Sequence, residues 1–224
     1  MLASISHPHI VQVFGRSIDK QTSECSLVME LMHKDLNDQI DAFTKSTSGA
    51  SFELPAALGI MLQIADAMLY LHKKEIVHRD LKARNILINH VKITEMVNSG
   101  YMQSKVADLC ESKVKLSSAT NSEQTVIGMS QWVALELFEE KSSDEMRYTF
   151  KADTYSYSIT CSEILMGKLP FADIEKRSEM KEAVKKGMRP ALPDSLPASM
   201  MSLIKRCWDA DPSMRPSSHG YALN

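Results

Sequence analysis

Eight residues at positions 78–85, His-Arg-Asp-Leu-Lys-Ala-Arg-Asn, stand between two apolar segments of different period. Before them, a proline opens a run over 55–72 in which apolar side chains recur every three or four residues, which predicts an amphipathic helix. After them, residues 85–89 form a short apolar run that is typical of a strand. The chain must therefore pass from a core helix to a strand through a tight turn rich in charge.

Three side chains of that turn can carry chemistry. Asp80, Lys82 and Asn85 lie within six positions, so a tight loop can direct all three toward one small volume. Phosphoryl transfer to a hydroxyl needs a carboxylate near the hydroxyl proton, a cation near the transferred group and a neutral oxygen ligand for magnesium. The competing interpretation is a charged turn that is only solvated.

The same turn resembles the catalytic loop of the protein kinase family, which reads H-R-D-x-K-x-x-N in its Ser/Thr members. This resemblance implies that Asp80 orients the substrate hydroxyl and acts as the base. It implies that Lys82 neutralises charge on the moving phosphoryl group and that Asn85 holds a metal ion. A lysine at position 82 also favours Ser/Thr over Tyr specificity within the family.

A second motif, Val-Ala-Asp-Leu-Cys at 106–110, is similar to the D-F-G segment of the family. The resemblance implies that Asp108 binds magnesium between phosphate oxygens. Cys110 replaces the glycine of the motif and removes its backbone freedom. A lone aspartate after a strand would be weak evidence by itself, and its position after Asp80 and Asn85 strengthens it.

Residues 27–32, Leu-Val-Met-Glu-Leu-Met, resemble the strand and hinge that lie behind adenine in this family. By that resemblance, backbone groups of Glu30 and Met32 meet the adenine edge and Leu87 packs beneath the ring. The implied cofactors are ATP and Mg²⁺. The competing interpretation is a short buried strand that binds no ligand.

A third motif, Gly-Met-Ser-Gln-Trp-Val-Ala-Leu-Glu, ends at Glu136 and resembles the G-T-x-x-W-M-A-P-E end of the family's activation segment. Met129 and Leu135 depart from that pattern. A buried glutamate needs a cation, and the resemblance pairs Glu136 with Arg215. It also implies that Asp153 accepts hydrogen bonds from the backbone of the catalytic loop.

The patterns further predict strands at 10–15, 26–32 and 105–109, loops at 44–53 and 90–104, and helices at 153–166, 173–187 and 197–208. Gly167 is expected to end the first of these helices, Asp173 to cap the second and Pro197 to open the third.

The resemblance implies an α+β fold, mainly α, namely a protein kinase-like C-lobe with a remnant of the N-lobe sheet. Residues 1–32 are expected to form the remnant, with the end of helix C, two strands and the hinge, and residues 33–224 the C-lobe. No G-x-G-x-x-G motif and no V-A-I-K lysine occur, so most of the lobe that grips ATP is expected to be missing. The surface facing that lobe would then be exposed and open to a partner.

Composition limits the remaining alternatives. Hydrophobic residues make up 44% and charged residues 24%, as in a globular protein, and the net charge of −2 gives no attraction to nucleic acid. Four scattered cysteines, without a C-x-x-C pair, argue against a zinc site or a disulfide scaffold. No signal sequence and no membrane span of about 20 apolar residues are expected, and a cytoplasmic location follows as the default.

Two functions remain open. One is a protein Ser/Thr kinase domain that transfers the γ-phosphate of ATP to hydroxyls of a protein substrate. The alternative is a catalytically weak or inactive kinase-like scaffold that binds a partner. The departures at Cys110, Met129 and Leu135 favour the scaffold, whereas the complete motif at 78–85, here named the catalytic turn, favours the enzyme.

Overall fold

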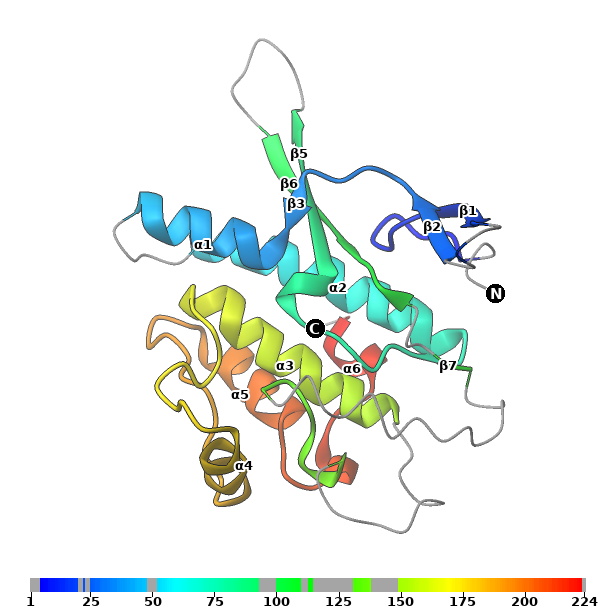
Figure 1. Cartoon of the computed structure of the whole chain (residues 1–224). Coiled ribbons are helices and arrows are strands. Elements are labelled where there is room, and N and C mark those ends of the chain that lie inside the picture. The colour runs from blue at the N-terminus through cyan, green and yellow to red at the C-terminus, as the bar shows by residue number, and fades with distance from the viewer. Residues whose placement is uncertain are drawn as a thin grey trace.

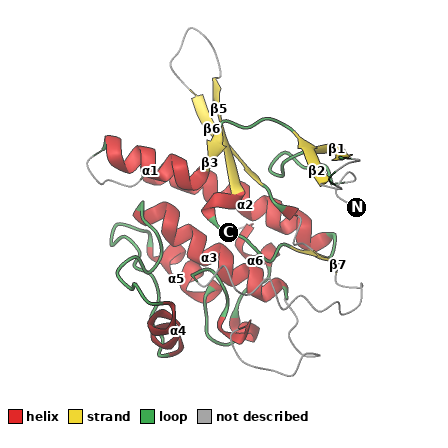
Figure 2. Cartoon of the chain, viewed as in Figure 1, coloured by secondary structure: helices red, strands yellow, loops and turns green. Residues whose placement is uncertain are grey.

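The computed structural model of the chain describes residues 5–19, 22, 25–47, 52–92, 100–109, 113–114, 131–137 and 149–222. Within these residues the helices gather on one side of the molecule and most strands lie along the other, while the strand at 113–114 lies beside the helices (Figure 1, Figure 2). Helices account for most of the regular structure, which confirms the predicted α+β fold with a helical majority.

The strands form three small sheets. Strands β1 (Val13–Ile18) and β2 (Cys25–Met29) make an antiparallel pair, and β4 (Ile76–Val77) pairs with β7 (Lys113–Val114). The third sheet has the order β3-β5-β6, formed by β3 (Lys34–Asp35), β5 (Ile86–Lys92) and β6 (Gly100–Val106). In Figure 1 the β1–β2 pair lies apart from the β3-β5-β6 sheet, with the chain between β2 and β3 joining the two.

The helices are α1 (Leu36–Ser46), α2 (Leu54–Lys73), α3 (Phe150–Met166), α4 (Arg177–Lys185), α5 (Ala198–Cys207) and α6 (Ser218–Ala222). Short 3₁₀ turns occur at η2 (Ala83–Asn85), η5 (Leu135–Leu137) and η6 (Pro212–Met214). The predicted signals at three ends are confirmed, because Pro55 lies in the first turn of α2, α5 begins directly after Pro197 and Gly167 ends α3. Gly167 has φ 65°, a left-handed conformation that glycine adopts without strain.

Helices α2 and α3 form the centre of the core. Every residue of α3 from 152 to 165 is buried, so this helix is enclosed on all sides rather than amphipathic. Helix α2 packs against β6, α3 and α6. The two helices thus provide a rigid support for the turn that joins β4 to β5.

By length and composition alone, α2 is the one helix of the described residues that could cross a membrane, with a mean hydropathy of 1.6. Half of that apolar window is buried inside the protein. Because α2 contacts α3, α6 and β6, its apolar composition is that of a core helix.

The hairpin of β5 and β6 corrects one prediction. The sequence predicts an inserted loop over 90–104, but β5 continues to Lys92 and β6 begins at Gly100, with the two ends paired in antiparallel register. Figure 1 shows this hairpin extending beyond the helices. Much of this extension faces solvent, with His90 and Tyr101 exposed, so its polar residues give the sequence pattern of a loop although the backbone forms a ladder.

Two helix boundaries also differ from the prediction. The loop expected over 44–53 begins later, because α1 runs to Ser46 and the Thr44 hydroxyl donates to the Ile40 carbonyl at 2.9 Å within that helix. The expected cap Asp173 lies in a turn, and α4 begins only at Arg177.

The start of the chain differs as well. The predicted first strand at 10–15 begins at Val13, since the segment before it docks on β6: the Val11 amide donates to the Val106 carbonyl, and the Val106 amide to the His9 carbonyl, each at 2.9 Å. The end of a helix predicted within residues 1–32 is not found in residues 5–12, which contain no helical residue, and residues 1–4 lie outside the described residues. The division into 1–32 and 33–224 stays a prediction.

Candidate active site

The turn between β4 and β5 brings its three predicted side chains together. The Lys82 Nζ and the Asn85 Nδ2 lie 2.9 Å and 2.8 Å from the same oxygen of Asp80, Oδ2. Asn85 Nδ2 also donates to the Asp80 carbonyl at 2.8 Å. Asp80 and Asn85 are buried, so these hydrogen bonds form largely out of water. A carboxylate, a cation and an amide therefore share one small volume.

Asp153 of α3 fixes the beginning of this turn through hydrogen bonds. Its two carboxylate oxygens accept the backbone amides of His78 at 2.8 Å and Arg79 at 3.0 Å, and His72 of α2 lies 2.9 Å away. Arg79 has φ 76°, which is unfavourable for a side chain of this size. The hydrogen bonds to Asp153 offset that strain and fix the path of the turn. The role predicted for Asp153 in the sequence is therefore confirmed.

His78 joins the turn to the end of β6. The Asp80 amide donates to His78 Nδ1 at 3.2 Å, and His78 Nε2 lies 3.1 Å from the carbonyl of Ala107. Those two partners assign the hydrogen to Nε2 and leave Nδ1 as an acceptor. Burial lowers the pKa of His78, which favours this neutral form, although the nearby Asp153 charge acts in the opposite direction.

Asp108 leaves β6 beside the same turn. The Ala107 amide donates to the Asn85 carbonyl at 2.8 Å, which places the end of β6 against η2. Asp108 follows directly, has φ 58° and is exposed to solvent. Its carboxylate is one of the charges that act on the buried His78 ring. The structure thus places Asp108 next to the turn that contains Asp80, Lys82 and Asn85.

Asn85 and Asp108 have the donor atoms of a magnesium site. Because Asn85 uses its Nδ2 as a donor to Asp80, its Oδ1 is the atom left to act as a ligand. Carboxylate and amide oxygens suit Mg²⁺, which commonly takes one or two protein ligands and completes its shell with water and phosphate. The described residues contain no cluster of three or more His, Cys, Asp or Glu that could hold a metal without such help.

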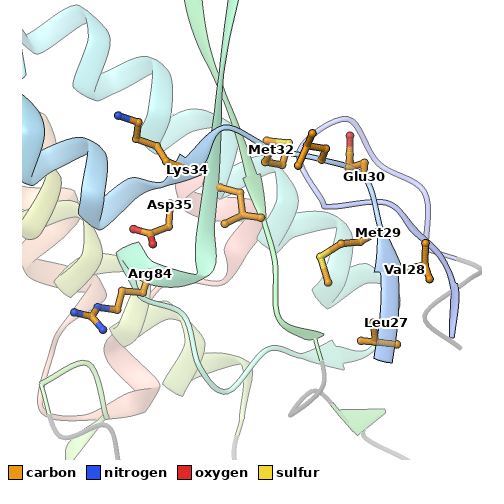
Figure 3. A pocket seen from close by; sticks show the side chains of 10 residues that line it. Leu27, Val28, Met29, Glu30, Met32, Lys34, Asp35 and Arg84 are labelled. Carbon is orange, nitrogen blue, oxygen red and sulfur yellow. The ribbon is translucent and has the colours of Figure 1, made fainter. Parts of the chain in front are cut away.

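A pocket of about 570 Å³ opens between β2, the segment that follows it, and η2. Of the residues predicted to contact a nucleotide, Glu30, Met32 and Leu87 line this pocket and Asp108 does not. Figure 3 shows Met29 on one side of it, and Lys34, Asp35 and Arg84 on the opposite side with their charged ends directed away from Met29. The remaining lining residues are Leu27, Val28 and Leu31.

Lys34, Asp35 and Arg84 were not predicted as site residues from the sequence. Asp35 caps α1 by accepting a hydrogen bond from the Asp38 amide at 2.8 Å. A sequence pattern can indicate such a helix start, but it cannot show that the residue lies beside a pocket. Arg84 belongs to η2, the turn that also contains Asn85. It therefore connects the pocket with the catalytic turn (Figure 3).

The backbone of Glu30 has one group committed within the protein. Its amide donates to the Gln12 carbonyl at 3.0 Å. A ligand in the pocket would therefore meet the carbonyl of Glu30 rather than its amide. The predicted contact between the Glu30 backbone and adenine stays a prediction.

The predicted ion pair between Glu136 and Arg215 is confirmed. Arg215 is fully buried, and its two terminal nitrogens lie 2.7 Å and 2.9 Å from the two oxygens of Glu136. Arg215 also donates to the carbonyls of Lys151 at 3.0 Å and Asp209 at 2.8 Å, so its charge is fully partnered. Leu135, one of the departures from the family pattern, lies in η5 beside this pair, whereas Cys110 and Met129 lie outside the described residues.

The family described as protein tyrosine and serine/threonine kinase matches residues 1–220. A light-sensor protein kinase from Ceratodon purpureus is 36% identical over 232 aligned positions, which cover 97% of this chain and 17% of that protein. Two Arabidopsis thaliana proteins, the serine/threonine-protein kinase STY17 and the serine/threonine/tyrosine-protein kinase HT1, are 29% and 31% identical over 97% and 96% of this chain. The chain spans 34% of STY17 and 50% of HT1, so it matches only part of each relative.

Proposed function

Because the chain belongs to the protein tyrosine and serine/threonine kinase family, we propose that it is a protein Ser/Thr kinase domain, which transfers the γ-phosphate of ATP to hydroxyls of a protein substrate. The observation that carries this proposal is the convergence of Lys82 and Asn85 on one oxygen of Asp80. Positioning and charge stabilisation supply nearly all of the catalysis in such reactions, and this turn provides both.

Each residue of the turn has a defined task in the proposed reaction. Asp80 accepts the proton of the substrate hydroxyl as that oxygen bonds to the γ-phosphorus and ADP leaves. Lys82 carries positive charge next to Asp80 and neutralises the transferred phosphoryl group. Asn85, through Oδ1, and Asp108, through its carboxylate, would hold Mg²⁺. When bound, that ion neutralises charge on the phosphate oxygens.

The pocket beside the turn is the proposed site of the adenine. The carbonyl of Glu30 and the amide of Met32 supply an acceptor and a donor for its edge, and Leu87 supplies an apolar surface beneath it. Support comes from the shared wall of the two sites, since Arg84 lies in the catalytic turn and also lines the pocket.

A transfer assay with γ-³²P-labelled ATP, Mg²⁺ and casein tests this function. The Asp80→Asn variant should lose transfer by about 10²–10⁴-fold, the range that a general base contributes. Asp194→Asn, which changes an exposed aspartate in a distant turn, is the matched control and should keep full activity. Equal background transfer by the wild type and Asp80→Asn would contradict the kinase proposal.

The alternative function is a kinase-like scaffold that binds a protein partner without phosphorylating it. Exposed apolar side chains on and beside the β1–β2 pair favour it, among them Phe14, which is 66% exposed, and Leu31, which is 93% exposed. The proposed partner covers this surface. Loss of partner binding in Phe14→Ser, with full binding retained in Asp80→Asn, would support the scaffold. A cytoplasmic location stays a prediction from the sequence.

A further inference from the structure

Glu163 is a buried carboxylate that the proposed reaction does not use. It lies in the core helix α3 and is 2% exposed. An isolated carboxylate in such a place is costly, so its partners must compensate for the loss of water.

The partners of Glu163 come from two different segments. The Trp132 indole nitrogen donates to Glu163 Oε2 at 3.1 Å, and the backbone amide of Ala83 lies close enough to this carboxylate to lower its pKa. Trp132 is held a second time by α3, because the Ser156 hydroxyl donates to its carbonyl at 2.8 Å. Glu163 therefore bridges the segment 131–137 and the catalytic turn.

Ala83 is the point at which this bridge can affect catalysis. It is fully buried and begins η2. The residue before it, Lys82, and the residue two positions after it, Asn85, both contact the same oxygen of Asp80. A displacement of the Ala83 backbone would thus move both of these side chains relative to the carboxylate.

The charge of Glu163 depends on the groups around it. Burial raises the pKa of Glu163 to about 7, and the hydrogen bond from Trp132 and the nearby amide of Ala83 act in the opposite direction. Of the charged groups packed around it, Asp41 of α1 raises this pKa further and Arg84 of η2 lowers it. Hydrogen bonds to a charged acceptor are stronger than bonds to a neutral one, so the ionised carboxylate holds the bridge more firmly.

We propose that Glu163 is a positioning residue, whose ionised carboxylate holds Ala83 and Trp132 together. In doing so it keeps the catalytic turn in the shape that directs Lys82 and Asn85 at Asp80. This inference rests on the proposed kinase function for its effect on rate, but the bridge itself can be measured without activity. Loss of the bridge slows phosphoryl transfer, and transfer rises with pH as Glu163 ionises.

The first test follows the bridge directly. Trp132 is one of only two tryptophans in the chain, so its emission can be followed between pH 5.5 and 8.5. The emission of the wild type should show an inflection near pH 7 that is absent in Glu163→Gln. The Trp132→Phe variant shows which part of the emission comes from Trp132. An inflection that persists unchanged in Glu163→Gln, or a folded wild type without one, would overturn the proposal.

Hydrogen exchange measured by mass spectrometry extends this test to the turn. In Glu163→Gln the peptide that contains Ala83 should exchange about tenfold faster at pH 8, because its amide loses a charged acceptor. Glu179→Gln, which changes an exposed glutamate of α4, is the matched control and should exchange like the wild type. Equal exchange at Ala83 in Glu163→Gln and the wild type would refute the bridge.

The kinetic test separates positioning from nucleotide binding. With γ-³²P-labelled ATP and casein, Glu163→Gln should lower kcat about tenfold at pH 8 with an unchanged KM for ATP, and its kcat should no longer rise between pH 6 and 8. A wild type without any transfer would contradict the proposed function, while the fluorescence and exchange results would still decide the bridge. An active Glu163→Gln with the wild-type pH profile would contradict the inference alone.

Discussion

Lys105 Nζ lies 2.7 Å and 2.8 Å from the two carboxylate oxygens of Glu30, so an ion pair joins β6 to the wall of the pocket. The backbone amide of Gln12 donates to the same carboxylate at 2.7 Å. Both charged side chains are mostly shielded from water, with exposed fractions of 13% for Lys105 and 23% for Glu30. The pair therefore fixes the position of Glu30 relative to the strand that leads to Asp108.

Lys105→Met should weaken binding of a fluorescent ATP analogue, because Glu30 loses the cation that fixes it at the pocket wall. We expect about a tenfold loss of affinity, and a loss of unfolding free energy of roughly 1–3 kcal/mol, since the pair is only partly buried. The exchanged variant Lys105→Glu/Glu30→Lys should recover part of both losses in a double-mutant cycle. Wild-type affinity in Lys105→Met would show that the pair does not position the pocket.

Asp153→Asn should destabilise the catalytic turn. The amide side chain keeps one acceptor oxygen, whereas the carboxylate of Asp153 accepts the amides of both His78 and Arg79. We expect a loss of about 2–4 kcal/mol in the free energy of unfolding, measured in urea. Asp173→Asn, at an exposed turn position, is the control. Unchanged stability in Asp153→Asn would mean that the turn is fixed by other contacts.

The ion pair between the buried Arg215 and the partly buried Glu136 should contribute to stability only while both partners are present. Arg215→Met removes the cation, leaves the Glu136 carboxylate without its main partner and should cost about 3–5 kcal/mol in urea denaturation. The double variant Arg215→Met/Glu136→Gln should be more stable than Arg215→Met, because it leaves no unpaired charge. A double variant that is less stable than both single variants would contradict this account.

Two buried titrating groups, His78 and Glu163, should affect the pH dependence of stability with opposite signs. Burial lowers the pKa of His78, so its contribution is present above pH about 6.5 and is lost as the pH falls below that value. Burial raises the pKa of Glu163 to about 7, so its contribution is greatest at low pH and is lost as the pH rises through about 7.

Unfolding in urea at pH 5, 6, 7 and 8 measures both effects. The free energy of unfolding of the wild type should decline by a few kcal/mol as the pH rises toward 7, at about 1.4 kcal/mol per pKa unit of Glu163. Glu163→Gln should remove this decline. His78→Gln should instead flatten the acid side of the profile. Profiles of both variants that run parallel to the wild type would contradict the assigned pKa shifts.

The catalytic turn could be predicted from the sequence because its evidence is local. Asp80, Lys82 and Asn85 lie close together in the chain, and the change from helical to strand period fixes the place of the turn. The pairing of Glu136 with Arg215 and the role of Asp153 could be predicted only through the family resemblance. In both cases the structure places the predicted partners in contact.

The remaining features depend on distant contacts that no periodicity shows. Lys105 and Glu30 are 75 positions apart, and each one, considered by itself in the sequence, indicates only an exposed charged side chain. Glu163 lies within a helix pattern, where a glutamate indicates a solvated face, and its burial follows only from the packing around α3. The length of the β5–β6 hairpin was missed because polar residues on an exposed ladder resemble a loop.

We propose that Asn85 and Asp108 hold Mg²⁺ beside Asp80, next to a nucleotide in the pocket. Calorimetric titration of the chain with ATP, with and without Mg²⁺, tests it most directly. We predict at least tenfold tighter binding with Mg²⁺, and loss of that difference in Asp108→Asn, with Asp194→Asn behaving as the wild type. ATP binding that is indifferent to Mg²⁺ in the wild type, or a Mg²⁺ effect that survives in Asp108→Asn, would show that Asn85 and Asp108 do not hold the ion.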